Sequence, residues 1–175
     1  MQWYNEPSQW HAQDNTVTVQ VGPGTDFWRL TYSGIIRDNG HFYYQSHEGD
    51  FLAQVKFSGQ YASLYDQAGL MVRVDEEHWL KCGVEFLDGV QHASAVVTRE
   101  YSDWSFVALP DNPASLWLRV KRQGITLEVY YSLDGEHYQL LRQAYLSPAP
   151  IMQIGLLCAS PEGPGFPVTF ENFTL

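Results

Sequence analysis

The sequence is poor in basic residues, in cysteine and in long apolar runs, and each shortage argues against a class of protein. It contains 10 Lys and Arg residues against 20 Asp and Glu, which gives a formal net charge of −10. A chain of this charge without a dense basic stripe repels the phosphate backbone, so no nucleic acid partner is expected. No uncharged apolar run approaches the roughly 20 residues of a membrane-spanning helix, so no membrane partner is expected either.

The only two cysteines, Cys82 and Cys158, lie in apolar segments typical of strands. A free cysteine in such surroundings behaves as a small hydrophobe. The N-terminal residues MQWYNEPSQW show neither the basic nor the apolar region of an export signal. We therefore expect two buried free thiols and a cytoplasmic location.

Helical periodicity is also missing, because no stretch of ten or more residues repeats apolar residues every 3.6 positions. Alternation with period two dominates instead, as in FLAQVKF at 51–57, LWLRVKR at 116–122 and TLEVYYS at 126–132. Turn signals separate such segments, and we expect a hairpin at each of Asp38-Asn39-Gly40, Asp88-Gly89 and Asp134-Gly135. The pattern predicts an all-β protein in which residues 1–175 form a single domain.

Arg73, Lys81 and Glu85 interrupt the apolar, strand-like runs between positions 64 and 86. In WLKCGVEF, at 79–86, Trp79, Lys81 and Glu85 have the same parity and should project from one face of a strand. AGLMVRV, at 68–74, is expected to pair with this strand through the turn DEEH and to bring Arg73 near them. Apolar walls with a few convergent polar groups are typical of a small-molecule site. An exposed cross-strand ion pair with no ligand explains the same charges.

Seven segments resemble a known family. They are TDFWR (25–29), DNGHFYY (38–44), GDF (49–51), LYDQAGLMVR (64–73), WLKCGVEF (79–86), VVTREYSDWS (96–105) and ASPEGPGF (159–166). In this order they resemble the bacterial and fungal family called "regulation of enolase", within the concanavalin-A-like lectin/glucanase superfamily. The resemblance implies a concanavalin-A-like jelly-roll sandwich of two antiparallel sheets, one with a concave face. It also implies that lectins, carbohydrate-binding modules and glycoside hydrolases, which bind sugar on that face, are neighbours of the fold.

Catalysis has little support in the sequence. Glycoside hydrolysis requires two carboxyl groups about 5 to 9.5 Å apart, and the resemblance implies that related hydrolases carry them on one strand as Glu-x-Asp-x-(x)-Glu. The matching strand here offers only Glu85; Asp66 could approach it from a neighbouring strand but fits equally well as a turn-capping residue. The histidines and cysteines lack metal-ligand spacing. We therefore predict no catalytic residue, no metal and no cofactor.

Aromatic and hydrogen-bonding residues complete the candidate site. Trp and Tyr can stack on the apolar face of a sugar, while carboxylate and amide groups bind its hydroxyls. We assign Trp3, Trp10 and Trp117 to packing. The predicted ligand-binding residues are Trp28, Asp66, Gln67, Arg73, Trp79, Lys81, Glu85, Trp104 and Ser105.

The sequence thus predicts a lectin-like domain that binds a saccharide or sugar-derived metabolite on its concave face. The alternative is a protein-interaction module that regulates a metabolic enzyme, as the family name suggests. This alternative predicts an exposed apolar patch rather than a deep pocket. The third hypothesis is a glycoside-processing enzyme that uses Glu85 as acid or base.

Overall fold

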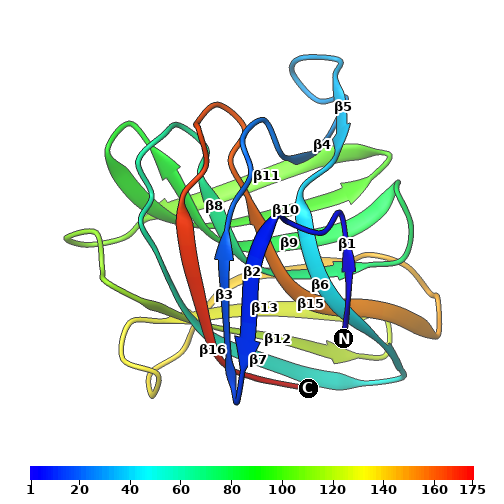
Figure 1. The fold of residues 1–175 in the computed structure, drawn as a ribbon. Helices are drawn as coiled ribbons and strands as arrows, with labels where there is room; N and C mark the ends of the chain where they lie inside the picture. The colour runs from blue at the N-terminus through cyan, green and yellow to red at the C-terminus, as the bar shows by residue number, and fades with distance from the viewer.

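A computed structural model describes residues 1–175 and contains only strands, turns and loops (Figure 1). It has no helix that could cross a membrane. The strands are β1 (Gln2–Tyr4), β2 (Gln9–Gln13), β3 (Thr16–Gln20), β4 (Phe27–Arg29), β5 (Ile36–Asp38), β6 (His41–Glu48), β7 (Phe51–Gly59), β8 (Gln67–Arg73), β9 (His78–Leu87), β10 (Val90–Arg99), β11 (Tyr101–Ala108), β12 (Leu116–Gln123), β13 (Thr126–Ser132), β14 (Gln139–Tyr145), β15 (Ile151–Ala159) and β16 (Pro167–Thr174).

Two seven-stranded antiparallel sheets face each other (Figure 1). Sheet A has the strand order β1-β6-β15-β8-β9-β10-β11, and sheet B has the order β14-β13-β12-β7-β16-β3-β2. The predicted all-β, concanavalin-A-like jelly-roll sandwich is confirmed. Strands β4 and β5 form a separate two-stranded sheet, here called the cover hairpin, which packs on the face of sheet A that points away from sheet B. We call that face the outer face of sheet A.

The alternating residues of the two sheets interlock into a core of 29 buried residues. The apolar residues of FLAQVKF, namely Phe51, Ala53, Val55 and Phe57, all point into it, as predicted. Both cysteines are free and buried in the same core. Burial raises the pKa of Cys82 to about 12 and raises the pKa of Cys158 as well, so both thiols stay protonated at neutral pH.

Two of the three turn signals form the expected hairpins. Asp88-Gly89 joins β9 to β10 and Asp134-Gly135 precedes β14, which pairs with β13. At Asp38-Asn39-Gly40 the prediction of a hairpin is wrong, because β5 pairs with β4 and not with the following strand β6. Tertiary contacts hold this turn: Asn39 Oδ1 accepts the backbone N–H of Asp26, and a Cβ at Gly40 would lie 2.4 Å from the Phe27 ring.

A second apolar cluster lies between the cover hairpin and sheet A. It explains why large apolar side chains share the outer face of sheet A with the charged residues. Phe27 of the hairpin is 0 % exposed, and Trp79 beneath it is 1 % exposed. The buried members of the cluster are Phe27, Phe42, Met71, Trp79, Val96 and Leu157.

Candidate functional site

The charges that interrupt the central strands share the outer face of sheet A, as predicted, but all of them are buried. Strands β8 and β9 pair in the register Met71↔Lys81 and Gln67↔Glu85. Arg73, Lys81 and Glu85 are 5 %, 4 % and 7 % exposed. The alternative of an exposed cross-strand ion pair is therefore wrong, because the cover hairpin shields this face from solvent.

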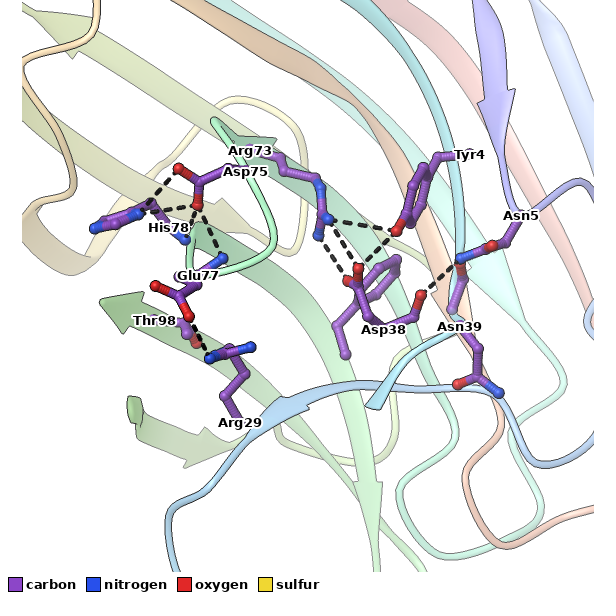
Figure 2. Close-up of polar contacts among 12 residues, drawn as sticks. Tyr4, Asn5, Arg29, Asp38, Asn39, Arg73, Asp75, Glu77, His78 and Thr98 are labelled. Atoms are coloured by element: carbon purple, nitrogen blue, oxygen red, sulfur yellow. Dashed lines mark hydrogen bonds and ion pairs between the residues drawn. The ribbon is translucent and has the colours of Figure 1, made fainter. Parts of the chain in front are cut away.

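Arg73 attaches strand β5 to sheet A. Its Nη1 lies 2.7 Å from Asp38 Oδ1 and its Nη2 lies 2.9 Å from Asp38 Oδ2 (Figure 2). The guanidinium stacks 4.6 Å from the centre of the Tyr4 ring, and the Tyr4 hydroxyl donates to Asp38 Oδ2 at 2.6 Å. This bidentate, stacked arrangement uses the geometry for which arginine is suited, so Arg73 serves the fold here.

Two further cations hold the cover hairpin. Arg29 pairs with Glu77 Oε1 at 2.7 Å at the other end of the hairpin (Figure 2). Lys81 lies 3.2 Å from Asp26 Oδ1 and donates to the Phe27 carbonyl oxygen at 2.7 Å. A lysine ammonium has three protons, and these contacts use two of them.

Glu85 differs from the other charges because no cation contacts its carboxylate. Its Oε2 accepts hydrogen bonds from Ser94 Oγ at 2.7 Å and from Trp104 Nε1 at 2.8 Å. No protein group donates to the other carboxylate oxygen, Oε1. This oxygen is not fully buried, so a small molecule can reach it. Burial raises the pKa of Glu85 above its usual value, although the nearby charge of Lys81 partly opposes this effect.

A small recess opens beside Glu85 where two glycines face each other across β8 and β9. Gly69 and Gly83 are paired in register, and a Cβ on Gly83 would lie 1.9 Å from the Ala68 carbonyl oxygen. Beside this glycine pair lies a cavity of about 10 Å³, enough for one water molecule or one hydroxyl group. The polar side chains that line it are Gln67, Lys81, Glu85 and Ser94.

Three aromatic side chains gather around Trp104, whose indole N–H donates to Glu85. The Trp104 ring meets Trp28 edge-on at 6.4 Å, Tyr65 at 6.3 Å and Phe106 at 4.5 Å between centroids. We call these four residues the aromatic rim. All are at least partly exposed. Tyr65 has a φ of 65°, and such left-handed backbone in a bulky residue is a form of strain that clusters at functional sites.

The structure brings some of the predicted site residues together and separates others. Gln67, Lys81 and Glu85 line the recess, and Trp28 and Trp104 belong to the rim. Arg73 and Trp79 lie on the same face but are covered by the hairpin.

Asp66 and Ser105 do not reach the recess, contrary to expectation. Both carboxylate oxygens of Asp66 are occupied: Oδ2 accepts the N–H groups of Ala62 and Ser63, and Oδ1 accepts Ser160 Oγ at 2.6 Å. Asp66 is thus a loop-capping residue, and its carboxylate does not pair with Glu85. Ser105 lies between Trp104 and Phe106 on β11, so its side chain points to the opposite face of the sheet. Its hydroxyl donates to the Ala95 carbonyl oxygen and accepts from Arg142 instead.

Sequence reasoning missed Ser94, Asp26 and Phe106. Ser94 was within reach, because the two-residue turn at Asp88-Gly89 fixes the register that sets Ser94 opposite Gly83. Asp26 carries no local signal, since it meets Lys81 across 55 residues of sequence. The structure contains no group of three or more His, Cys, Asp and Glu residues that could hold a metal ion.

Comparisons with known proteins place this geometry in a family context. The family model "Protein of unknown function (DUF1349)" matches residues 3–175. "Regulation of enolase protein 1" of Saccharomyces cerevisiae is 39% identical over 173 residues, which cover 99% of this chain and 87% of that protein. A crystal structure of a functionally unknown protein from Saccharomyces cerevisiae superposes with a TM-score of 0.95 at 39% identity, covering 99% of this chain and 94% of the other.

A more distant structure shares the fold alone. The carbohydrate-binding module CBM66 from Bacillus subtilis superposes with a TM-score of 0.61 at 14% identity, covering 98% of this chain and 93% of the module. At an identity this low, the match shows a shared architecture.

Proposed function

The chain belongs to the DUF1349 family of proteins of unknown function, and from its site we propose that it binds a saccharide or a sugar-derived metabolite at the recess beside Glu85. One hydroxyl of the ligand enters the recess, and the rest of the molecule lies against the aromatic rim. Carbohydrate binding by the CBM66 module, which shares the fold, supports this ligand class by analogy.

The observation that carries the proposal is the free oxygen of Glu85. A buried carboxylate without a countercharge in contact destabilises a fold, so its presence is typical of a functional site. A ligand hydroxyl that donates to Oε1 would satisfy the unpaired oxygen. The third proton of Lys81 and the amide oxygen of Gln67 are also uncommitted, because the lysine makes two contacts and the amide uses only its N–H₂ group. These groups match the mixed donor and acceptor character of a sugar hydroxyl.

A thermal-shift screen of monosaccharides, disaccharides, polyols and sugar phosphates tests this function, run on the wild type and on Glu85→Gln. A ligand at a hundredfold excess over its Kd stabilises the folded state by about 2.7 kcal/mol. We expect a shift that is present in the wild type, lost in Glu85→Gln and kept in Glu171→Gln. Glu171 is a matched control because it pairs with Lys56 on sheet B, away from the recess. The proposal fails if no compound shifts the wild type, or if Glu85→Gln responds equally.

A second candidate function is supported by the tip of the cover hairpin. Tyr32 in the loop between β4 and β5 is fully exposed, and Ile35 and Ile36 are 49 % and 52 % exposed. Such an apolar tip fits a protein-interaction module that regulates a metabolic enzyme, and one relative is named for the regulation of enolase. Binding of purified enolase that is lost in a Tyr32→Ser/Ile35→Ser variant, but kept in Glu85→Gln, would favour this function. Absence of binding to the wild type would remove it.

A further inference from the structure

The two lateral edges of the sandwich differ in packing: aromatic side chains fill one edge, and a cleft opens at the other. At the edge formed by β1 and β2, Trp3, Trp10 and Tyr43 pack on the core, with ring centroids 5.4 Å apart for the two tryptophans and 4.8 Å apart for Trp3 and Tyr43. This packing confirms the role predicted for Trp3 and Trp10. At the opposite edge, where β10 and β11 approach β14, a cleft of about 410 Å³ opens instead. Its volume lies within the range of about 300 to 1,000 Å³ that is usual for small-molecule sites.

The cleft contains the one cationic side chain that has no polar partner. Nine of the 10 Lys and Arg residues form a hydrogen bond or an ion pair, and Arg99 forms neither. Its guanidinium stacks over the Tyr145 ring at 5.6 Å. In a chain with twice as many acidic as basic residues, an unpaired arginine is unexpected. The stacking orients the guanidinium and leaves its N–H groups free to bind.

A second arginine, Arg142 of β14, lines the same cleft. Arg142 Nη2 lies 3.1 Å from Asp103 Oδ2 and Nη1 donates to Ser105 Oγ at 3.3 Å. The Asp103 side chain is 69 % exposed, so this ion pair is weak and an incoming anion can compete with it. Tyr101 and Tyr145 add hydroxyl groups that make no hydrogen bond within the protein, so they are free to donate.

We propose that this cleft is a second ligand site, separate from the recess at Glu85, which binds a small organic anion through a phosphate or carboxylate group. Arg99 binds the oxyanion directly. Arg142 turns from Asp103 toward the ligand, and the tyrosine rings contact its organic part. A guanidinium binds a carboxylate and a phosphate in the same way, through two parallel N–H···O bonds. The chemistry that the two ligand classes share is therefore a pair of anionic oxygens on one atom.

Calorimetric titration at low ionic strength tests the site with three probes: inorganic phosphate, glucose 6-phosphate and citrate, with glucose as the uncharged control. Stronger binding of glucose 6-phosphate than of inorganic phosphate would show that the organic part contributes, and stronger binding of citrate would identify a carboxylate ligand. We expect Arg99→Gln to raise the Kd of the best probe about tenfold, which corresponds to about 1.4 kcal/mol. Binding should also weaken as salt is added, because the contact is ionic.

Two further variants make the test specific. Asp103→Asn removes the internal competitor of the ligand, so the Kd should fall, an effect opposite to that of Arg99→Gln. Lys56→Gln removes one positive charge from the other sheet and should leave the Kd unchanged. The proposal is overturned if no probe binds the wild type, if Arg99→Gln binds as the wild type does, or if Asp103→Asn weakens binding. Equal melting temperatures of the wild type and Arg99→Gln confirm that the exposed substitution leaves the fold intact.

Discussion

Asp38 and Arg73, 35 residues apart in sequence, form a bidentate ion pair between the cover hairpin and sheet A, with N–O distances of 2.7 and 2.9 Å (Figure 2). The side chains are 22 % and 6 % exposed. Most of the charge on the outer face of sheet A therefore attaches the hairpin, and Glu85 is the exception.

Breaking this pair should destabilise the protein strongly. Asp38→Asn leaves the buried Arg73 guanidinium without a countercharge, which costs about 3 kcal/mol in comparable buried pairs. The free energy of unfolding, measured by urea denaturation, should fall by about that amount. Asp103→Asn is the matched control, because it breaks an exposed pair with Arg142 and should cost less than about 1 kcal/mol. Similar losses in the two variants would contradict a structural role for the Asp38–Arg73 pair.

The architecture was predictable because its signals are local. Alternation in FLAQVKF and LWLRVKR reports burial of one side of a strand, and Asp88-Gly89 specifies a two-residue hairpin. The pairing of β8 with β9 followed from the same reasoning, which placed Arg73, Lys81 and Glu85 on one face.

The covering of that face was not predictable, because it depends on contacts between distant segments. Nothing near Lys81 indicates that Asp26 lies against it, and three-residue strands such as β4 and β5 are too short to show a periodicity. Asp66 shows the same limit on a smaller scale. Its neighbour Gln67 faces the recess, and only the fold of residues 62–66 reveals that the carboxylate turns back to cap its own loop.

The paired glycines beside the recess should be intolerant of a side chain. In Gly83→Ala the new Cβ would lie 1.9 Å from the Ala68 carbonyl oxygen, and both groups belong to the sheet backbone. We expect a loss of about 3 kcal/mol in the free energy of unfolding, at the upper end of overpacking effects. Gly89→Ala is the control, since its Cβ would meet nothing within 4 Å and only its φ of +85° opposes the substitution, a cost of about 1 kcal/mol. A smaller loss at Gly83 than at Gly89 would refute the steric explanation.

Glu85→Gln should change how stability depends on pH. The folded-state pKa of Glu85 is raised above its usual value of 4.5, so between these two values the folded protein holds a proton that the unfolded chain has released. The stability of the wild type therefore falls as the pH rises through this interval. Glutamine does not titrate and can still accept from Ser94 and Trp104, so the stability of the variant relative to the wild type should increase with pH. Urea denaturation between pH 4 and pH 7 measures this difference, and a constant difference would show that the carboxylate is not desolvated.

His41 should make the protein sensitive to mild acid. Its ring accepts the Gly22 N–H at Nε2, at 3.0 Å, which requires the proton on Nδ1, where it is donated to the Asn5 carbonyl oxygen at 2.7 Å. Burial lowers the pKa of His41 below its usual value of 6.5, so the unfolded chain binds a proton first and stability falls as the pH drops below about 6.5.

The expected contribution of His41 is at most about 1.4 kcal/mol per pH unit, the value for one proton. The test is to measure the free energy of unfolding of the wild type and His41→Gln between pH 7.5 and pH 5. We expect the variant to be less stable at pH 7.5 but to lose less stability on acidification, because it has no imidazole to protonate. The exposed His11, replaced in His11→Gln, should leave the wild-type slope unchanged. If His41→Gln and the wild type lose stability in parallel, the acid sensitivity has another source and His41 only holds the N-terminal segment at Asn5.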